Sequence, residues 1–232
     1  MSWSHAMEIK FVAEPIVNMT NNKLMAVEVL SRFYTPNGLQ LSTQDTILRL
    51  SSAMKINILQ KQINAMAEKK LFFIKNNLTC SINVDYDTCF FILKNKNLRQ
   101  AISDNNFIAL EVSERFPYFN ENGSIIINNL LKVTGHIWID DFGSDDCKIN
   151  MSQLQHVEAI KLDKEFLHRI LGKDYSIEIL KKISKIYPKI IAEGVETKHI
   201  MDKIKDINLW GGQGYYYPSV KLSDIYKLQT YL

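Results

Sequence analysis

Features that would point to a membrane or secreted protein are missing from this 232-residue sequence. No apolar run approaches the roughly 20 residues that a membrane-spanning helix needs, and no segment has the charged start and apolar centre of a signal peptide. The three cysteines, Cys80, Cys89 and Cys147, show neither metal-ligand nor redox spacing. We therefore expect a cytoplasmic protein with reduced thiols and no membrane segment.

The sequence also lacks a large excess of charge of one sign. Lys and Arg number 28 and Asp and Glu number 25, which gives a formal net charge of +3. Binding to duplex nucleic acid or to a membrane surface usually requires a stronger basic excess. Neither is an expected partner, so any anionic ligand must be met by a local site.

Nothing in the sequence divides the chain into several domains. It has no linker rich in Gly, Ser or Pro, no low-complexity tract and no obvious repeat. Hydrophobic residues make up 46% and charged residues 23%, which is typical of a globular protein with a sizeable core. Residues 1–6 resemble the remnant of an expression tag, so we expect one domain over residues 7–232.

The sequence does contain an alternation of short strand-like segments with longer helical ones. Eight segments rich in Val, Ile and Phe are predicted strands, at residues 10–17, 24–33, 79–84, 107–112, 136–141, 159–163, 189–192 and 209–216. Apolar residues spaced three or four apart predict helices at residues 43–54, 56–73, 86–95, 98–103, 124–133, 151–156, 166–186 and 198–207. A last helix is expected from Ser223, a suitable N-cap.

Eight strands alternating with helices favour an α/β fold, a closed (β/α)8 barrel of the TIM type. The first two strands depart from this pattern, because only residues 18–23 connect them. Such a connection suits a hairpin, so the first strand is predicted to be antiparallel.

Polar residues interrupt these apolar strands at or near their carboxyl ends. They are Glu28, Asn83, Glu111, Asp140, Asp141, Lys161, Glu193 and Gln213. Because the carboxyl ends of barrel strands share one face, we expect these side chains to form a single site. Any one acidic residue among them is more simply a solvated strand end or a helix cap, and only their repetition favours a site.

Carboxylates that converge in this way repel one another unless cations neutralise them. A ligand set of oxygens, without Cys or His, fits Mg²⁺ or Mn²⁺ rather than Zn²⁺. The five histidines show no ligand spacing and are expected to be surface or packing residues: His5, His136, His156, His168 and His199.

The polar residues lie in motifs that resemble those of the EAL-domain family of cyclic di-GMP phosphodiesterases. The matching segments appear in family order at residues 14–17, 27–33, 82–84, 110–114, 140–144, 160–163, 192–197 and 213–216. The resemblance extends from about Phe11 to Val220. It implies a two-metal phosphodiesterase that hydrolyses cyclic di-GMP to linear pGpG and so lowers a second messenger of biofilm and motility signalling.

The resemblance also implies a role for each residue of the site. Two ions would be held by Glu28, Asn83, Glu111, Asp140, Asp141 and Glu193, with Asp140 bridging. Lys161 and Gln213 would position the attacking water, so that the catalytic set is Glu28, Asp141, Lys161, Glu193 and Gln213. Arg32, Glu14 and Leu30 would contact the substrate, and Glu114 would anchor the loop after the aspartate pair. Ca²⁺ is expected to inhibit, because this larger ion prefers longer and more numerous contacts.

Two departures from the family pattern matter most, beside the mild apolar changes at Val29 and Phe33. Residues 143–146 read Gly-Ser-Asp-Asp where the family has Gly-Thr-Gly-Tyr, and Glu14 replaces a glutamine. In related proteins that loop couples metal binding to dimer contacts, so the resemblance implies a homodimer formed near residues 145–155.

Two alternatives remain open. One is a catalytically weak EAL protein that acts as a cyclic di-GMP receptor or a protein-binding regulator. The other is a barrel enzyme for another phosphodiester, since metal chemistry does not select the base. The presence of every metal ligand favours catalysis.

Overall fold

A computed structural model describes residues 7–113, 116, 121–144, 157–173, 176–187 and 189–231. Eight strands close into a barrel in which each pairs with the next and the eighth pairs with the first. They are β1 (Glu8–Asn18), β2 (Lys23–Tyr34), β3 (Thr79–Val84), β4 (Ile108–Ser113), β5 (Ile137–Phe142), β6 (Ala159–Leu162), β7 (Ile190–Ala192) and β8 (Gly211–Gly212). A short strand, β9 (Val220–Lys221), pairs with the outer part of β1.

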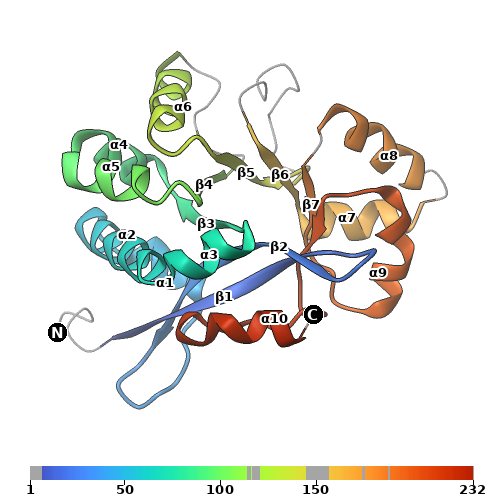
Figure 1. The fold of residues 1–232 in the computed structure, drawn as a ribbon, viewed down its shortest axis with the longest axis horizontal. Helices are drawn as coiled ribbons and strands as arrows, with labels where there is room; N and C mark the ends of the chain where they lie inside the picture. The colour runs from blue at the N-terminus through green and yellow to red at the C-terminus, as the bar shows by residue number, and fades with distance from the viewer. Residues whose placement is uncertain are drawn as a thin grey trace.

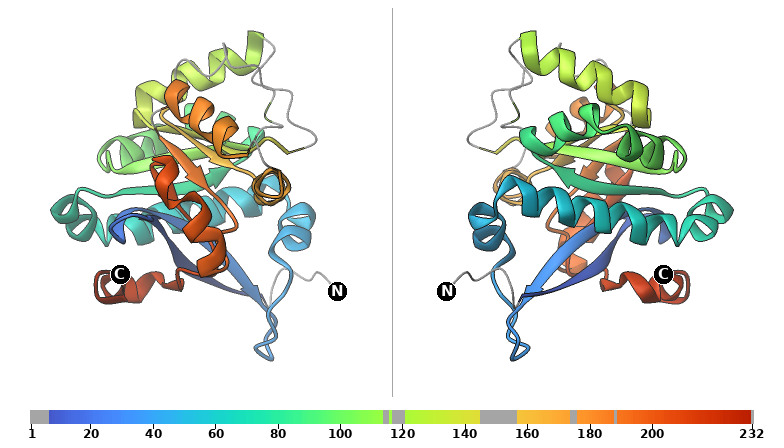
Figure 2. Two further views of the ribbon diagram at one scale, coloured as in Figure 1. Left: turned by 90° about the vertical axis from the view of Figure 1, so that its right-hand side faces the viewer. Right: turned by 90° about the vertical axis from the view of Figure 1, so that its left-hand side faces the viewer.

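The direction of the strands confirms the predicted exception. Strand β1 runs antiparallel to both β2 and β8, whereas the pairs from β2 to β8 are parallel. The predicted α/β barrel with an antiparallel first strand is therefore confirmed. Strands β1 and β2 are the longest and extend away from the other strands as a two-stranded ribbon (Figures 1 and 2).

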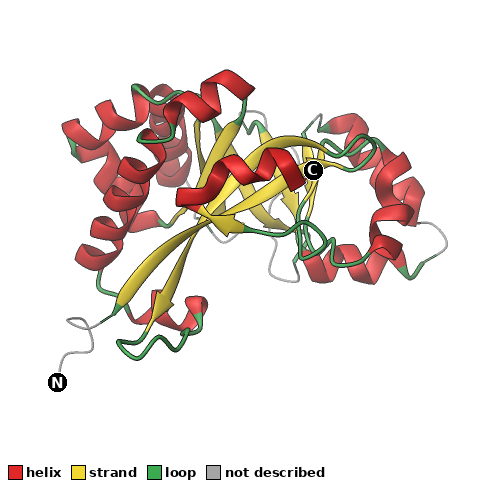
Figure 3. Ribbon diagram, turned by 60° about the horizontal axis from the view of Figure 1, so that its bottom comes forward, coloured by secondary structure: helices red, strands yellow, loops and turns green. Residues whose placement is uncertain are grey.

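Helices surround the strands on the outside, as Figure 3 shows by colour. They are α1 (Thr43–Arg49), α2 (Ser52–Ala67), α3 (Lys70–Asn76), α4 (Tyr86–Lys94), α5 (Lys96–Ser103), α6 (Glu121–Thr134), α7 (Lys164–Leu171), α8 (Ser176–Ile186), α9 (Lys198–Ile204) and α10 (Leu228–Tyr231). Helices α1 to α5 lie on one side of the strands and α7 to α9 on the other (Figure 1). No helix in the described part of the chain has both the length and the apolar character needed to cross a membrane.

Several predicted elements differ from the observed ones. The predicted helix 166–186 is two helices, α7 and α8, and α7 ends at Leu171 with Gly172 as its C-cap. The predicted helices 43–54 and 56–73 are three helices, α1, α2 and α3. The first break lies before Ser52, because the Ser51 side chain accepts a hydrogen bond from the Met54 backbone and caps α2. The last strand is predicted over residues 209–216, but β8 comprises only Gly211–Gly212. The predicted helix 151–156 lies outside the described residues.

The predicted N-cap at Ser223 is wrong. A 3-10 helix, Leu222–Lys227, begins one residue earlier with Lys221 at its cap position and no side-chain cap, and it leads into α10. Leu222 and Ile225 are both buried. Burial of these apolar residues sets the start of this segment, overriding the capping preference of serine.

The barrel interior consists of two layers, one apolar and one polar. The apolar layer contains Ile16, Ala26, Ala109, Trp138, Ala159 and Ile191. The polar layer contains Glu28, Glu111, Asp140, Lys161 and Glu193, each placed two residues closer to the carboxyl end of its strand than the apolar residue. Glu14 lies at the same level on antiparallel β1. Because strand residues two apart face the same side, every strand that contributes to the apolar layer also delivers a polar side chain to the mouth of the barrel.

Candidate active site

Lys161 lies at the centre of the polar layer. Its side chain is 1% exposed, and its Nζ is ion-paired with four carboxylates: Glu193 Oε1 at 2.8 Å, Glu28 Oε2 at 3.0 Å, Asp140 Oδ1 at 3.1 Å and Glu111 Oε2 at 3.2 Å. Burial alone would lower the pKa of Lys161, but the surrounding carboxylates, Asp140 foremost, outweigh it and raise the pKa well above its usual value. The ammonium therefore keeps its proton and cannot itself bind a metal ion.

Glu28 is the most fully hydrogen-bonded acid of the site. Besides Lys161, the Asn83 side-chain amide donates to Glu28 Oε1 at 2.6 Å, and the Gln213 amide donates to Glu28 Oε2 at 2.6 Å. Burial raises the pKa of this carboxyl, but the charge of Lys161 and the hydrogen bonds from these amides lower it further, and the net pKa is below normal. Glu28 is thus held as a carboxylate.

Glu111 and Glu193 have the opposite electrostatic character. Burial raises the pKa of Glu193 to about 8, against the opposing charge of Lys161. Burial and the neighbouring Glu28 charge raise the pKa of Glu111 well above normal. The buried Glu111 Oε1 accepts no hydrogen bond from any described residue. One lysine is therefore too little positive charge for the acids that surround it.

The end of β5 brings two consecutive aspartates to the same site. Consecutive residues of a regular strand point to opposite faces. Asp141, however, has a left-handed backbone with φ of 56°, and the pairing of β5 with β6 is irregular between Ile139 and Phe142. As a result, carboxylate oxygens of Asp140, Asp141 and Glu193 lie within 4.8 Å of one another. A left-handed non-glycine residue is uncommon, and aspartate tolerates it better than most.

The donor set fits divalent cations that prefer oxygen ligands. Five carboxylates, from Glu28, Glu111, Asp140, Asp141 and Glu193, converge with a single buried ammonium. The unpaired Glu111 oxygen and the raised pKa of two of the acids are signs of uncompensated negative charge. Mg²⁺ or Mn²⁺ bound to oxygen atoms would supply that compensation.

A pocket of about 660 Å³ opens beside this cluster. The residues predicted to contact substrate border it: Glu14, Leu30 and Arg32. Arg32 forms an ion pair with Glu14 at 2.6 Å, and the Gln213 amide lies 3.3 Å from Glu14 Oε2. The replacement of glutamine by Glu14 thus gives the arginine an internal acidic partner.

Some residues of this pocket had not been predicted from the sequence. Lys164, Glu196 and Tyr215 line it, and Tyr215 is 87% exposed. Each stands within three residues of a predicted site residue, and Glu196 and Tyr215 also lie in the matching segments 192–197 and 213–216. Glu114 and the predicted dimer segment 145–155 lie outside the described residues, so their roles stay predictions.

A sequence model described as "EAL domain" matches residues 2–219. The chain belongs to the EAL-domain family. Among its relatives, the protein named "Probable cyclic di-GMP phosphodiesterase PdeG" of Escherichia coli K12 is 28% identical over 93% of this chain and 45% of its own length. Cyclic di-GMP phosphodiesterase PdeH of the same organism is 25% identical over 90% of this chain and 82% of its own. The chain thus spans less than half of PdeG but most of PdeH.

A third relative of this EAL domain has a different name. The anti-FlhC(2)FlhD(4) factor YdiV of Salmonella paratyphi B is 20% identical over 90% of both chains. A crystal structure described as EAL-like domain protein YdiV superposes with a TM-score of 0.85, 20% identity and coverage of 98% of this chain and 99% of that one. At this identity the superposition establishes the fold alone.

Proposed function

We propose that this EAL domain is a metal-dependent phosphodiesterase that hydrolyses cyclic di-GMP to linear pGpG. The observation that carries the proposal is the complete set of carboxylates around Lys161 at the carboxyl end of the barrel. Phosphodiester hydrolysis needs concentrated positive charge at a phosphoryl group, and an oxygen-rich cluster is where a protein collects divalent cations. The names of PdeG and PdeH support the choice of substrate.

Each residue of the site has its own role in this proposal. Glu28, Asn83, Glu111 and Asp140 would hold one ion, and Asp140, Asp141 and Glu193 the second. When bound, such ions supply charge neutralisation and lower the pKa of water. Lys161, held protonated, donates hydrogen bonds at the centre of the cluster and orients the water to be deprotonated. Gln213 fixes Glu28, and Arg32 meets a phosphate of the substrate, for which its planar fork is suited.

The decisive experiment is to incubate the chain with cyclic di-GMP and Mg²⁺ or Mn²⁺ and to separate the products by chromatography. We expect pGpG as the product, much slower turnover in Ca²⁺, and little hydrolysis of bis(p-nitrophenyl) phosphate. The folded Glu28→Ala variant is the matched control and should be inactive. Equal rates in Ca²⁺, or normal turnover by that variant, would contradict the two-metal assignment, and preferential cleavage of the generic diester would point to another substrate.

A second candidate function is regulation by protein binding, which the similarity to YdiV favours. YdiV matches this chain over nearly its whole length both in sequence and in fold. A protein-binding regulator does not need a complete carboxylate set. Because this chain has that set, we rank regulation below catalysis. Binding of cyclic di-GMP without any product under the conditions above would support this second candidate.

We also propose that the chain forms a homodimer through the region near residues 145–155. Related domains pair through the helix after the fifth strand, and light scattering of an active sample at micromolar concentration tests this. A mass of twice 26.9 kDa is expected. A sample that is fully active and monomeric would overturn it.

A further inference from the structure

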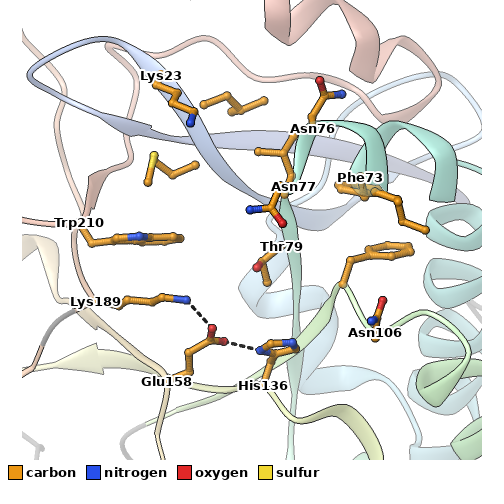
Figure 4. Close-up of a pocket in the computed structure, with 15 residues that line it drawn as sticks. Lys23, Phe73, Asn76, Asn77, Thr79, Asn106, His136, Glu158, Lys189 and Trp210 are labelled. Atoms are coloured by element: carbon orange, nitrogen blue, oxygen red, sulfur yellow. Dashed lines mark hydrogen bonds and ion pairs between the residues drawn. The ribbon is translucent and has the colours of Figure 1, made fainter.

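A second cavity lies at the amino ends of the strands, opposite the carboxylate cluster (Figure 4). We call it the basal pocket. Its lining includes residues that begin or directly precede five different strands: Lys23, Thr79, His136, Glu158 and Lys189. Its volume is about 510 Å³, which is within the range of sites that bind small organic molecules.

The floor of the basal pocket is a carboxylate held by three donors. Glu158 Oε2 accepts a hydrogen bond from Trp138 Nε1 at 3.0 Å and lies 2.7 Å from His136 Nδ1, while Lys189 pairs with Oε1 (Figure 4). Burial opposes ionisation, but these hydrogen bonds lower the pKa of Glu158 to about 2. The hydrogen bond to Glu158 also raises the pKa of His136. Since Lys189 balances Glu158, the Lys23 ammonium leaves the pocket with an excess of positive charge.

Other polar groups of the basal pocket have no partner among the described residues. The Lys23 ammonium, the Asn77 side-chain amide and the Thr79 hydroxyl make no hydrogen bond or ion pair with the described residues. Figure 4 shows Lys23 and Asn77 extending toward the space bounded by Trp210. These groups offer a cation, an amide and a hydroxyl to a ligand.

An aromatic ring forms one wall of the basal pocket. Trp210 packs edge-to-face against buried Trp138, with centroids 6.0 Å apart, and Lys189 Nζ lies 5.2 Å from the Trp210 centroid. The indole is thereby fixed, and it is only partly buried. A planar ring can stack on such a surface, and base–aromatic stacking contributes about 1–3 kcal/mol.

We propose that the basal pocket binds a nucleoside monophosphate, with its base stacked on Trp210 and its phosphate near Lys23. This class of ligand combines the three chemical features that the pocket matches: a flat ring, hydroxyl groups and an anion. The proposal does not depend on the function of the opposite face. The competing interpretation is that the Glu158 cluster only stabilises the end of the barrel, as residues at the amino face commonly do.

The test is calorimetric titration of the full chain with GMP and AMP, with guanosine and inorganic phosphate titrated separately. We expect a saturable site for the nucleotides with a Kd below about 1 mM, accompanied by quenching of tryptophan fluorescence. Guanosine, which lacks the anion, and phosphate, which lacks the ring and the sugar hydroxyls, should bind about tenfold more weakly or worse. Absence of saturable nucleotide binding, or phosphate binding as tight as that of GMP, would overturn the proposal.

Variants then locate the site. Lys23→Ala, at an exposed position, should weaken GMP binding about tenfold, and Asn77→Gly about threefold. Asn77 has a φ of 51°, which glycine adopts readily, so this variant keeps its fold. Lys205→Ala, directly after α9 at a surface ion pair with Asp202, is the matched lysine control. If Arg32→Ala weakens GMP binding while Lys23→Ala does not, the nucleotide occupies the pocket at the mouth and the proposal is wrong.

Discussion

Lys161 decides the electrostatics of the site at the scale of a single residue. It is buried among four carboxylates, and two of the surrounding acids have raised pKa values even in its presence. Its ammonium supplies part of the positive charge that the acids would otherwise receive from bound cations. A residue of this kind affects both the chemistry and the stability of the metal-free protein.

We predict that Lys161→Ala lowers the turnover of cyclic di-GMP by about a hundredfold or more, the usual scale for a positioned proton-transfer or electrostatic group. Substrate affinity, measured by calorimetry in Ca²⁺, should change much less. In the absence of metal ions the variant should also lose about 3–5 kcal/mol of unfolding free energy, since buried acids are left without their partner.

The matched control for this prediction is Lys205→Ala. The Lys205 side chain is 41% exposed and pairs with Asp202 at 3.0 Å, so its removal should leave the stability nearly unchanged. Urea unfolding of both variants with and without Mg²⁺ makes the comparison. Lost substrate binding with undiminished turnover of the bound substrate would show that Lys161 is a binding residue.

The convergence of the candidate site residues could be predicted from the sequence, but their contacts could not. Strand ends marked by Glu28, Glu111 and Asp140 converge as expected because barrel topology dictates it. The left-handed backbone at Asp141 and the pairing of Arg32 with Glu14 depend on local backbone geometry and rotamers. No spacing rule specifies these details.

Gly214 shows how a connecting segment controls the site at the scale of an element. It follows Gln213 directly after β8, and a Cβ at position 214 would lie 2.5 Å from the backbone N and O of Val195. Its φ of 153° is also one that other residues rarely adopt. The loop after β8 and the loop after β7 are therefore in direct backbone contact, which sets the position of Gln213.

We predict that Gly214→Ala displaces Gln213 and lowers turnover by about tenfold or more, because a backbone cannot move aside as a side chain can. We expect both the turnover rate and the thermal stability to decrease. Gly172→Ala is the control, since its Cβ would lie 3.7 Å from the nearest atom. Steady-state kinetics of both variants, with thermal unfolding, provide the measurement. A fully active Gly214→Ala enzyme would show that the two loops adjust freely.

Glu158 links the amino ends of three neighbouring strands. Its partners His136 and Lys189 directly precede β5 and β7, and Glu158 itself precedes β6. These strands carry Asp140, Lys161 and Glu193 at their other ends. Nothing in the sequence pattern marked this cluster, because its members stand at or just before the first positions of predicted strands and belong to no motif.

Stability at acid pH should depend on Glu158. A carboxyl with a lowered folded-state pKa stabilises the fold above its unfolded pKa, and this contribution is lost as pH falls through the folded value. For Glu158 the window runs from about pH 4.5 to about pH 2. At about 1.4 kcal/mol per pKa unit, and with allowance for solvent screening, the contribution is about 2–3 kcal/mol.

We therefore predict that Glu158→Gln lowers the unfolding free energy at pH 6 by about this amount and flattens its decline between pH 4.5 and 2. Urea unfolding at several pH values measures it, with Glu68→Gln at an exposed position as the control. A pH profile parallel to that of the unaltered protein would assign the acid sensitivity to other carboxyls.

Among the elements, regular strands were predicted best and helix boundaries least well. Strands such as Thr79–Val84 combine β-branched residues with closure of the barrel, so pattern and topology agree. The apparent helix 166–186 hid a break after Leu171, because apolar spacing continues across two helices that pack on the same barrel. Strand β8 is short because its residues are glycines followed at once by the site residue Gln213.

At the scale of the whole molecule, the barrel separates its charges between two ends. The carboxyl end concentrates acids around Lys161, and the amino end holds Lys189 and His136 around Glu158, with Lys23 lining the same pocket. The near-neutral composition conceals this separation, because a net charge of +3 averages over both faces. The alternation of apolar and polar layers within the strands is what permits it.

The acidic end should make the stability of the whole fold depend on divalent cations. A cation that binds only the folded chain raises stability by RT ln(1 + [ligand]/Kd), about 2.7 kcal/mol at a hundredfold excess over Kd. For a chain of this size each kcal/mol raises Tm by about 2–4 °C, so we predict that saturating Mg²⁺ or Mn²⁺ raises Tm by about 5–10 °C relative to EDTA.

Calorimetric scans at constant ionic strength, set with NaCl, exclude general screening. Glu28→Ala should reduce the rise to less than half, whereas Asp202→Asn, at a surface ion pair, should leave it intact. An equal rise in both variants would mean that the ions bind elsewhere, and the carboxylate layer would then be a site of charge repulsion rather than a metal centre.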